Sequence, residues 1–222
     1  MKISEEDIRE TIEDRIIYDN VTVLYLFSKR IFDIAASFFA LLLLSPVFLG
    51  IWILIKVDSE GSVIFKQERV GHKGKIFKMY KFRSMIVNAE EHLERLEKKN
   101  EISGYMFKIK EDPRVTRIGR FIRKTSIDEL PQLINVLKGD MSLVGPRPPL
   151  PREVIRYDRW HNLRMSVKPG ITGLWQVSGR NKLGFDEMVR LDLKYIRERN
   201  FCYDIKIIFR TIPVLFGDRH AF

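Results

Sequence analysis

An apolar segment in the first third of the chain most constrains how the chain can fold. Residues 31–57 are apolar on every face of a helix, so the segment is not an amphipathic surface helix. A helix of about 25 residues is roughly 38 Å long, which is enough to cross a lipid bilayer. We therefore expect the segment to lie in a membrane. The alternative, a helix buried in a soluble core, would be unusually long.

Two features of this segment argue against a straight crossing. Ser45-Pro46 lies near its middle, where proline removes a hydrogen bond and kinks a helix, and the Ser45 hydroxyl can satisfy a carbonyl that the break frees. Lys29 and Arg30 precede the segment and Lys56 ends it, and short basic flanks prefer the cytoplasm. Both flanks obey that rule only if the segment enters and returns on one side. A re-entrant helix is therefore expected, and a kinked crossing helix is the alternative.

Two further predictions concern the charged residues at the start of the segment. Lys29 and Arg30 are predicted to anchor the segment at the membrane interface. Asp33 is a carboxylate that is costly in such a place unless it is paired, and we expect Arg30 or a downstream arginine as its partner.

The net charge of the 222-residue chain is +10, and it is unevenly distributed. Residues 1–28 carry −4, so the rest of the chain carries +14. This excess indicates anionic partners such as phosphates, an acidic membrane surface or nucleic acid. We expect no nucleic acid partner, because no recognition-helix motif is evident and the apolar segment would have no role in one. Cys202 is the only cysteine, which excludes an internal disulfide.

The rest of the chain has mixed helical and strand patterns. Two short strands are expected over residues 63–70 and 76–82, joined by a turn at residues 71–74. Helices are expected over residues 86–100, 126–137 with Gly139 as C-cap, 152–165, 186–199 and 203–216, and a further short strand over 171–177. The last helix mixes large apolar side chains with Lys206 and Arg210. It fits either a membrane interface or a position that closes the core.

Two adjacent carboxylates, Asp128 and Glu129, are the strongest candidates for chemistry. Five basic residues precede them within residues 114–124, and Arg147 follows. A carboxylate that attacks a phosphoryl group needs cations that screen charge repulsion, and a neighbour that holds a metal on the phosphate oxygens. One carboxylate would attack and the other would hold Mg²⁺. The structural alternative is a capping box, which Ser126 and Glu129 also fit.

Short motifs extend along nearly the whole chain. They are Lys29-Arg30 with Asp33, Ser45-Pro46, Gln67-x-Arg69-x-Gly71, Lys81-Phe82-Arg83-Ser84-Met85, Asp112-Pro113-Arg114, Ser126-Ile127-Asp128-Glu129-Leu130-Pro131-Gln132, Gly145-Pro146-Arg147-Pro148 and Lys168-Pro169-Gly170-Ile171-Thr172-Gly173. In the order and number of these motifs the chain closely resembles the monotopic bacterial phosphoglycosyl transferases, also called the bacterial sugar transferase family. It looks like the undecaprenyl-phosphate hexose-1-phosphate transferase type.

The resemblance implies an α+β fold. A re-entrant helix-break-helix would be joined to a mostly helical cytoplasmic catalytic domain with a small β element and interfacial amphipathic helices. We therefore expect the chain to have three parts: an acidic N-terminal extension over residues 1–28, the re-entrant helix over 29–57 and the catalytic domain over 58–222. The last two parts would form one unit. We expect a small member that is reduced to the catalytic core.

The resemblance also implies the reaction and its residues. Asp128 would attack the β-phosphate of a UDP-sugar and form a covalent phosphosugar-aspartyl intermediate, UMP would leave, and polyprenyl phosphate would accept the sugar phosphate. Glu129 would hold Mg²⁺. The expected substrate- and phosphate-binding residues are Arg114, Arg147, Arg83, Pro146, Pro148 and Gln67. For Arg83 and Gln67 the alternative role is to stabilise the fold.

The stretch over residues 160–181 looks like enzymes that start exopolysaccharide or O-antigen units with a hexose. UDP-galactose or UDP-glucose is therefore the expected donor, and an N-acetylated UDP-sugar remains an alternative. We expect the protein at the cytoplasmic face of the bacterial inner membrane, among membrane lipids, with downstream glycosyltransferases and a second copy of itself as further partners. The rival class is a membrane-anchored binding or scaffold protein.

Overall fold

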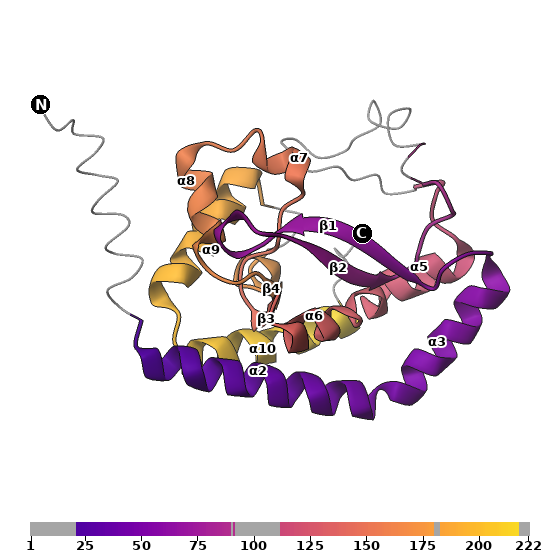
Figure 1. The fold of residues 1–222 in the computed structure, drawn as a ribbon, viewed down its shortest axis with the longest axis horizontal. Helices are drawn as coiled ribbons and strands as arrows, with labels where there is room; N and C mark the ends of the chain where they lie inside the picture. Colours follow the sequence, from indigo (N-terminus) through magenta and orange to yellow (C-terminus); the bar gives the residue numbers. More distant parts are fainter. Residues whose placement is uncertain (1–20, 90, 92–111, 180–182, 218–222) are drawn as a thin grey trace, which may run out of the picture.

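The computed structural model describes residues 21–89, 91, 112–179 and 183–217, which form helices around two small sheets (Figure 1). This mixed α and β content agrees with the expected fold class. Most of the helix expected over residues 86–100 falls outside the described residues. The part that is described forms a bridge and turns rather than a helix.

The apolar segment forms two helices that meet at a break. Helix α2 (Val23–Leu43) and helix α3 (Ser45–Asp58) are bent by 60° relative to each other. Pro46 lies in the first turn of α3, and the Ser45 hydroxyl donates to the carbonyl oxygen of Leu42 over 2.8 Å. The predicted kink at Ser45-Pro46 is therefore confirmed. In the described part of the chain, no one helix has the length and apolar character to cross a membrane, whereas the bent pair together does.

Helix α2 begins earlier than the sequence indicated. It starts at Val23 rather than near residue 29, because Thr22 caps it by accepting a hydrogen bond from the backbone N–H of Tyr25 over 3.2 Å. The helix therefore includes residues 23–28, which we had assigned to the acidic extension.

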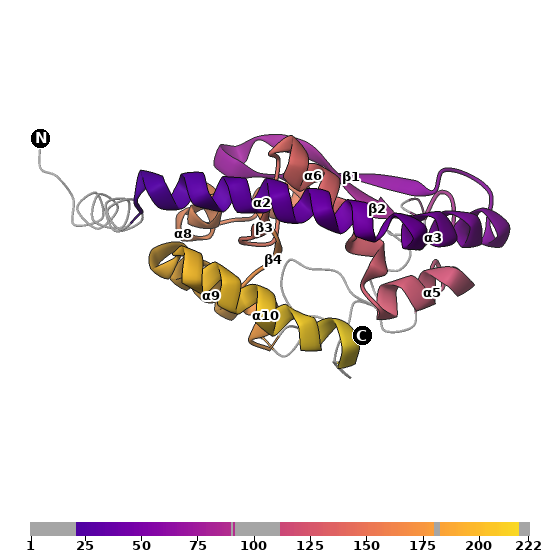
Figure 2. The same cartoon turned by 90° about the horizontal axis from the view of Figure 1, so that it is seen from below.

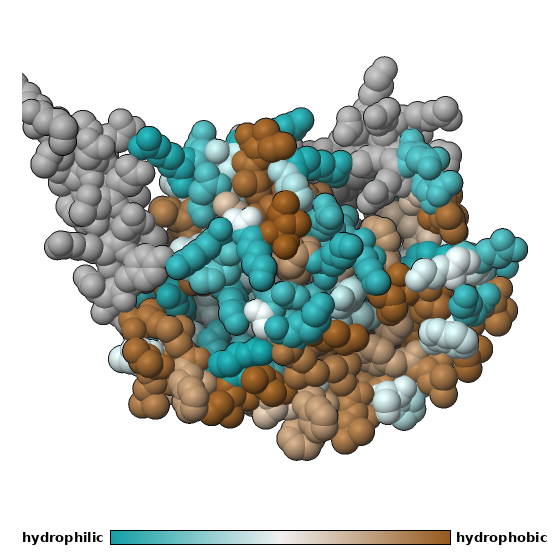
Figure 3. Space-filling model, viewed as in Figure 1, coloured by the Kyte–Doolittle hydropathy of each residue, from teal (hydrophilic) through white to brown (hydrophobic). Residues whose placement is uncertain are grey.

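The outer faces of both helices are apolar and exposed. Phe39, Leu43 and Leu49 are 64%, 80% and 61% exposed, and Figure 3 shows hydrophobic surface along the edge where Figure 1 places α2 and α3. Burying such side chains contributes about 25 cal/mol for each Å² that is removed from water. An exposed apolar face of this size is typical of a membrane or protein contact. The alternative of a helix buried in a soluble core is therefore wrong.

The expected β-hairpin is present at almost the expected bounds. Strand β1 (Ile64–Val70) pairs antiparallel with β2 (Ile76–Phe82), and the short turn η1 (His72–Gly74) joins them. In this register Gln67 is opposite Met79, and side chains alternate between the two faces of the hairpin. Alternate residues of the two strands therefore share one face.

The helix expected over residues 126–137 is broken into two parts. A single 3₁₀ turn, η3 (Ile127–Glu129), is followed by helix α6 (Gln132–Lys138), with Pro131 as its N-cap. Ser126 has a φ of 55° and its side chain makes no capping hydrogen bond, so the capping-box alternative is wrong. Gly139 ends α6 in the left-handed conformation, as expected.

Three further helices and a second sheet complete the fold. Strand β3 (Ser142–Val144) runs parallel to β4 (Gly170–Thr172), helix α5 (Arg117–Lys124) precedes η3, and α9 (Phe185–Glu198) and α10 (Phe201–Gly217) end the described chain. A Cβ on Gly170 would lie 2.1 Å from the backbone nitrogen of Gly145, so glycine is required where these two segments meet. The helices expected over 186–199 and 203–216 are confirmed.

The region between β3 and α9 is less regular than expected. Helix α7 (Pro151–Val154), helix α8 (Arg159–Asn162) and η4 (Leu163–Ser166) replace the single helix expected over 152–165. The backbone N–H of Asp158 donates to the imidazole of His161 and starts a new helix there. The strand expected over 171–177 is confined to β4, and η5 (Trp175–Val177) follows it.

The charged residues at the start of the apolar segment bind protein groups. Lys29 forms an ion pair with Asp204 of α10 at 2.8 Å. Arg30 donates to the last carbonyl oxygens of α6, at 2.6 Å to Val136 and 2.9 Å to Leu137. These contacts tie α2 to α6 and α10, and the role of Lys29 and Arg30 as anchors at the membrane interface stays a prediction.

Asp33 does not pair with an arginine as expected. Its carboxylate accepts a hydrogen bond from the backbone N–H of Leu143 over 3.0 Å, at strand β3. Asp33 is buried, so the apolar segment and the second sheet are joined by a polar contact that is shielded from water.

Helix α10 closes the core with one face and exposes a second, apolar face, so its position at a membrane interface stays a prediction. Ile207 is fully buried and packs against Tyr195 and Ile196 of α9, so one face closes the core. Phe209 and Ile212 are exposed, so another face is apolar and open. Figure 2 shows α2, α10 and α5 on the same side of the molecule.

Candidate functional site

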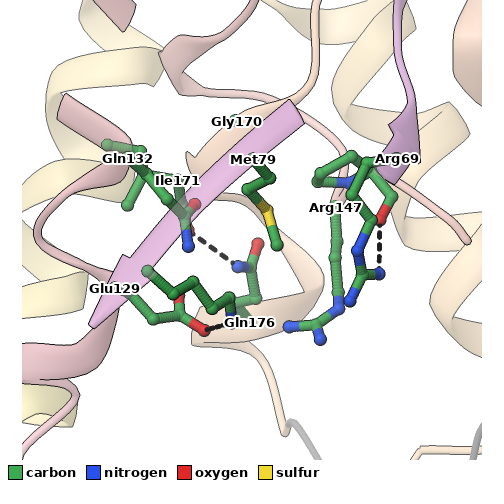
Figure 4. A pocket seen from close by; sticks show the side chains of 10 residues that line it. Arg69, Met79, Glu129, Gln132, Arg147, Gly170, Ile171 and Gln176 are labelled. Atoms are coloured by element: carbon green, nitrogen blue, oxygen red, sulfur yellow. Dashed lines mark hydrogen bonds and ion pairs between the residues drawn. The ribbon is translucent and has the colours of Figure 1, made fainter. Parts of the chain in front are cut away.

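A small hollow lies where the hairpin, η3, α6 and the second sheet meet. It encloses about 220 Å³, counting space that is open to solvent. It is lined by Arg69, Met79, Lys81, Glu129, Gln132, Arg147, Pro148, Gly170, Ile171 and Gln176 (Figure 4). Pockets for whole small molecules are typically larger, about 300–1,000 Å³. The hollow is therefore too small for a complete nucleotide sugar.

Three cationic side chains line this hollow. Arg69 and Lys81 come from opposite strands of the hairpin, and Arg147 comes from the segment after β3. In Figure 4 Arg69 lies on one side of the hollow and Glu129 on the other, with Arg147 extending between them. The guanidinium groups can each offer two parallel N–H donors to phosphate oxygens.

Arg69 is buried and holds the loop that carries Arg147. It donates to the carbonyl oxygen of Pro148 over 2.9 Å and to the side-chain oxygen of Gln67 over 2.6 Å. Burial, together with the positive charge of Arg147, lowers the pKa of Arg69 to about 9. Arg69 therefore remains charged at neutral pH, and the two arginines lie together although they repel each other.

Glu129 is the carboxylate of the hollow. Its side chain is 28% exposed and forms an ion pair with Lys81 at 3.0 Å. Burial alone would raise the pKa of Glu129, but the positive charges of Lys81, Arg147 and Arg69 outweigh it and hold the pKa well below its usual range. Glu129 is therefore ionised at neutral pH and accepts hydrogen bonds only.

Asp128 lies in a different environment, although it is the adjacent residue. It is only 9% exposed and is not among the side chains that line the hollow. Burial raises the pKa of the Asp128 carboxyl, and the negative charge of Glu129 raises it further, while the positive charges of Lys81 and Arg123 oppose this rise. Two neighbouring carboxylates with pKa values shifted in opposite directions are typical of a site that divides two chemical roles.

The backbone that presents this pair is held in an uncommon conformation. Ser126, directly before η3, is one of three residues other than glycine with positive φ in the described chain. Such a conformation costs of order 1–3 kcal/mol and is concentrated at functional sites. The turn is therefore maintained by its surroundings, and Lys81 is one of the residues that hold it.

Buried Asn135 holds α6 against the hairpin. Its side-chain oxygen accepts the backbone N–H of Tyr80 over 2.9 Å, and its amide donates to the carbonyl oxygen of Lys78 over 2.8 Å. These two bonds fix the register between the strand that carries Lys81 and the helix that follows Glu129.

Two of the expected phosphate-binding residues do not line the hollow. The Arg114 guanidinium pairs with Asp112 at 2.6 Å and donates to the carbonyl oxygen of Ala89. Arg83 donates to the carbonyl oxygens of Ser59 and Glu60, just after α3. Both arginines hold neighbouring segments together, which is the alternative role we gave for Arg83.

The other expected residues lie at the hollow or directly behind it. Arg147 and Pro148 line it, and Gln67 accepts a hydrogen bond from the Arg69 guanidinium. Pro146 acts through its carbonyl oxygen, which accepts the backbone N–H of Gly170 over 2.9 Å. This bond ties the loop that carries Arg147 to strand β4.

Four polar or charged lining residues were not among the candidates drawn from the sequence: Arg69, Lys81, Gln132 and Gln176. Arg69 and Lys81 lie within the quoted motifs, two residues from the candidates Gln67 and Arg83. The hairpin register would have placed Arg69, Met79 and Lys81 on one face, because alternate residues of paired strands share a face.

Glu129 is the side chain that could bind a metal ion within the hollow. The described residues contain no cluster of three or more acidic, histidine or cysteine side chains that could hold a metal ion. Mg²⁺ is usually held by one or two carboxylates together with substrate phosphates and water. One ionised glutamate among cationic side chains that could bind substrate phosphates fits that donor set.

Comparison with known proteins gives a consistent result. The family described as "Bacterial sugar transferase" matches residues 24–218. The galactosyl transferase CpsE of Streptococcus agalactiae is 52% identical over 192 residues, which cover 86% of this chain and 42% of that protein. The undecaprenyl-phosphate galactose phosphotransferase of Salmonella typhimurium is 48% identical over 193 residues, which cover 85% and 40%.

The exopolysaccharide production protein ExoY of Sinorhizobium fredii is 40% identical over 199 residues, which cover 88% of both chains. The chain thus spans about two fifths of the length of the Streptococcus and Salmonella relatives and most of the length of ExoY.

Proposed function

The chain belongs to the bacterial sugar transferase family, and on this premise we propose that it is a phosphoglycosyl transferase. It moves hexose 1-phosphate from a UDP-sugar to a polyprenyl phosphate and releases UMP. The observation that carries the proposal is the pair Asp128 and Glu129, whose pKa values are shifted apart beside a hollow lined by three cations.

The first step forms a covalent enzyme intermediate. A carboxylate oxygen of Asp128 attacks the β-phosphorus of the donor, and the bond from that phosphorus to the oxygen bridging it to the α-phosphate breaks. That oxygen leaves with UMP, and the sugar phosphate stays on Asp128. Because Asp128 is largely buried, the proposed approach of the donor phosphate is from the adjacent hollow, which Glu129 and Lys81 line.

The second step regenerates the enzyme. An oxygen of polyprenyl phosphate attacks the same phosphorus, the bond to Asp128 breaks, and polyprenyl diphosphate-linked sugar leaves. The donor is soluble and the acceptor is held in the bilayer, so a covalent intermediate lets the two substrates use one site in turn. The ionised carboxylate of Asp128 is restored by this departure.

The cations of the hollow bind and orient the phosphates. Arg147 and Arg69 supply forked N–H donors, and Lys81 forms an ion pair with Glu129. Their combined charge reduces the repulsion between the Asp128 carboxylate and an incoming diphosphate. Since transfer of a phosphoryl group depends mainly on positioning and charge stabilisation, these residues account for most of the expected rate enhancement.

Glu129 is the residue proposed to hold Mg²⁺. When bound, the ion would screen the charge of the phosphate oxygens. Glu129 is kept ionised by its cationic neighbours, so a ligand oxygen is available at neutral pH. Chelation with EDTA is expected to stop UMP release, and Glu129→Gln is expected to raise the Mg²⁺ concentration needed for half-maximal release.

Residues 23–58 are proposed to form a re-entrant membrane segment at the cytoplasmic face of the bacterial inner membrane. The 60° bend and the exposed apolar faces support this placement, and so do Lys29 and Arg30 before the apolar run 31–57 and Lys56 at its end. Single cysteines at Thr22 and Ser62, in a Cys202→Ser background, are both expected to react with a thiol reagent from the cytoplasmic side only. Reaction of the two positions from opposite sides would show a crossing segment.

The proposed donor is UDP-galactose or UDP-glucose, and the acceptor is undecaprenyl phosphate. The names of the Streptococcus and Salmonella relatives support galactose, and that of ExoY supports a role in exopolysaccharide synthesis. An N-acetylated UDP-sugar is the alternative donor. Glycosyltransferases that extend the lipid-linked sugar would act next, and a homodimer is compatible with the proposal.

Mass spectrometry of the enzyme incubated with donor and Mg²⁺, but without acceptor, tests the proposal. The peptide that contains Asp128 is expected to gain the mass of the sugar phosphate, and Asp128→Asn is expected to abolish both this adduct and UMP release. Asp140→Asn provides a matched control. If Asp128→Asn releases UMP at the rate of the unchanged protein, the chain is better described as a membrane-anchored binding or scaffold protein.

A further inference from the structure

Helix α5 presents a basic face that the proposed reaction does not use. Arg117, Arg120 and Lys124 are exposed at intervals of three and four residues, and Phe121 among them is 51% exposed. The four side chains therefore lie on one face of the helix, which we call the α5 stripe. The helix has no acidic residue, and the three cations form no ion pair within the described part of the chain.

The opposite face of α5 is fixed against the rest of the protein. Ile118 and Ile122 belong to the apolar cluster that contains Ile51 and Ile55 of α3. A Cβ on Gly119 would lie 1.9 Å from the carbonyl oxygen of Ser84, so the backbone of α5 is in close contact there. The helix cannot turn its stripe inward without breaking these contacts.

The stripe lies beside the end of the apolar segment. The backbone N–H of Ile118 donates to the carboxylate of Asp58, the last residue of α3, over 3.2 Å. Figure 2 shows α5 next to α3 on the side that also presents α2 and α10. Cationic side chains are therefore placed where the exposed apolar surface of α3 ends.

We propose that the α5 stripe binds the headgroups of anionic phospholipids. This inference rests on the proposed membrane placement of α2 and α3. Lipid phosphates complement the three unpaired cations, and Phe121 can enter the boundary between headgroups and acyl chains as aromatic side chains do at interfaces. Each basic residue near an anionic bilayer contributes about 1 kcal/mol, which is roughly a fivefold change in affinity.

A membrane partner fits the stripe better than an acidic protein or a nucleic acid. The stripe adjoins exposed apolar side chains of α3 and is continuous with the side that carries α2 and α10. A partner dissolved in the cytoplasm would have to approach the same side as the bilayer. The binding of a single-stranded oligonucleotide or of an acidic peptide is therefore an outcome that would count against the proposal.

Titration of fluorescent phosphatidylglycerol into the full chain, held in neutral detergent micelles at low salt, tests this inference. The triple variant R117Q/R120Q/K124Q is expected to weaken binding by on the order of 100-fold. The matched control R190Q/K194Q/R197Q neutralises three exposed cations on α9 and is expected to change binding by less than about threefold. Phosphatidylcholine is expected to compete poorly.

Four outcomes would overturn the inference. They are equal loss of binding in the two triple variants, no loss in the α5 variant, competition by inorganic phosphate as strong as by unlabelled phosphatidylglycerol, and tighter binding of an acidic peptide or oligonucleotide than of the lipid. Circular dichroism verifies that the α5 variant folds, and the milder single variant R120Q is expected to weaken binding roughly fivefold.

UMP release in the same samples separates this inference from the proposed function. The α5 variant is expected to release UMP at the rate of the unchanged protein in neutral micelles. If neither protein releases UMP, the proposed function fails, while the lipid titration still decides the role of the stripe.

Discussion

Two of the arginine-containing charged clusters in the described residues are built in opposite ways. Between η4 and α9, Arg164 pairs with Asp192, and both side chains are at most 2% exposed. In the hollow, Arg69, Lys81 and Arg147 share one carboxylate, Glu129. The first cluster balances its charges within the protein, and the second keeps an excess of positive charge.

The difference distinguishes an ion pair that stabilises the fold from cations that are available to bind an anionic ligand. A buried charge without a partner is costly, so Arg164 needs Asp192 for the protein to fold. Burial and the like charge of Arg147 lower the pKa of Arg69, so these cations are not balanced within the protein. A diphosphate would neutralise their repulsion. The same arginine chemistry would then stabilise the protein in one place and, in the proposed reaction, bind substrate in the other.

Arg147→Ala is expected to show the largest effect. Loss of a guanidinium that stabilises a phosphoryl transition state lowers kcat/KM by roughly 10³-fold. Thermal stability should be retained or slightly raised, because Arg69 loses a neighbour of like charge. UMP-release kinetics and thermal unfolding of the purified protein measure the two effects. The exposed Arg156→Ala serves as control, and a comparable loss in that variant would argue against a specific role for Arg147.

Asp192→Ala is expected to show the reverse pattern. Removing the partner leaves the Arg164 charge buried and uncompensated, which lowers the free energy of unfolding by about 3–5 kcal/mol. Activity per folded molecule should change little. Urea unfolding in detergent checks this, and the double variant R164M/D192L should recover most of the lost stability because it removes both charges. Failure of the double variant to recover would show that Arg164 has a role beyond its pair.

The pH dependence of UMP release probes the carboxylate pair. The reaction needs ionised Asp128, whose pKa is raised by burial and by Glu129. Activity should therefore fall with decreasing pH at values above the usual aspartate pKa of about 4. The contribution of Asp128 to the free energy of unfolding changes with pH in the opposite direction. Because the pKa of Asp128 is higher in the folded protein, this contribution is fully present below the usual aspartate pKa and decreases as the pH rises through the raised value.

Lys81→Met sharpens this measurement. Lys81 is the strongest opposing charge on Asp128, so its removal should move the acidic limb of the kcat/KM profile to higher pH. If the acidic limb of the pH profile is unchanged in this variant, a group other than Lys81 controls the ionisation of Asp128.

Ser126→Gly is expected to have the smallest effect. Glycine adopts positive φ without steric cost, so relief of the left-handed conformation should raise the free energy of unfolding by about 0.5–1 kcal/mol. UMP release should change by less than about threefold if the turn keeps its geometry. Thermal unfolding and initial rates measure both quantities, and a loss of stability would show that the Ser126 side chain contributes contacts of its own.

Local patterns in the sequence were sufficient for part of the fold. The hairpin, the kink at Pro46, the Gly139 cap and helices α9 and α10 follow from alternation, from proline and glycine chemistry and from helical spacing. The broken segments at residues 126–137 and 152–165 did not follow. The first break is a left-handed backbone conformation at Ser126, and the second is a hydrogen bond from the backbone N–H of Asp158 to the His161 side chain. Helical spacing of apolar residues indicates neither of them.

The candidate site was predictable to a similar degree. Asp128, Glu129 and Arg147 were indicated by residue type and by the family resemblance. The ion pair between Lys81 and Glu129 joins residues 48 positions apart and depends on how α6 docks on the hairpin. No local pattern contains that docking, because buried Asn135 sets it through the backbone of the neighbouring strand.

The contact between Arg30 and the last carbonyl oxygens of α6 couples helix α2 mechanically to the turn that carries Asp128 and Glu129. Helix α6 is about 10 Å long, and its first turn directly follows η3. If α2 lies in the bilayer as we propose, this one short helix sets the distance of η3 from the lipid. A bilayer of different thickness would then tilt α2 and move the two carboxylates with it, so that membrane composition would influence the geometry of the proposed site.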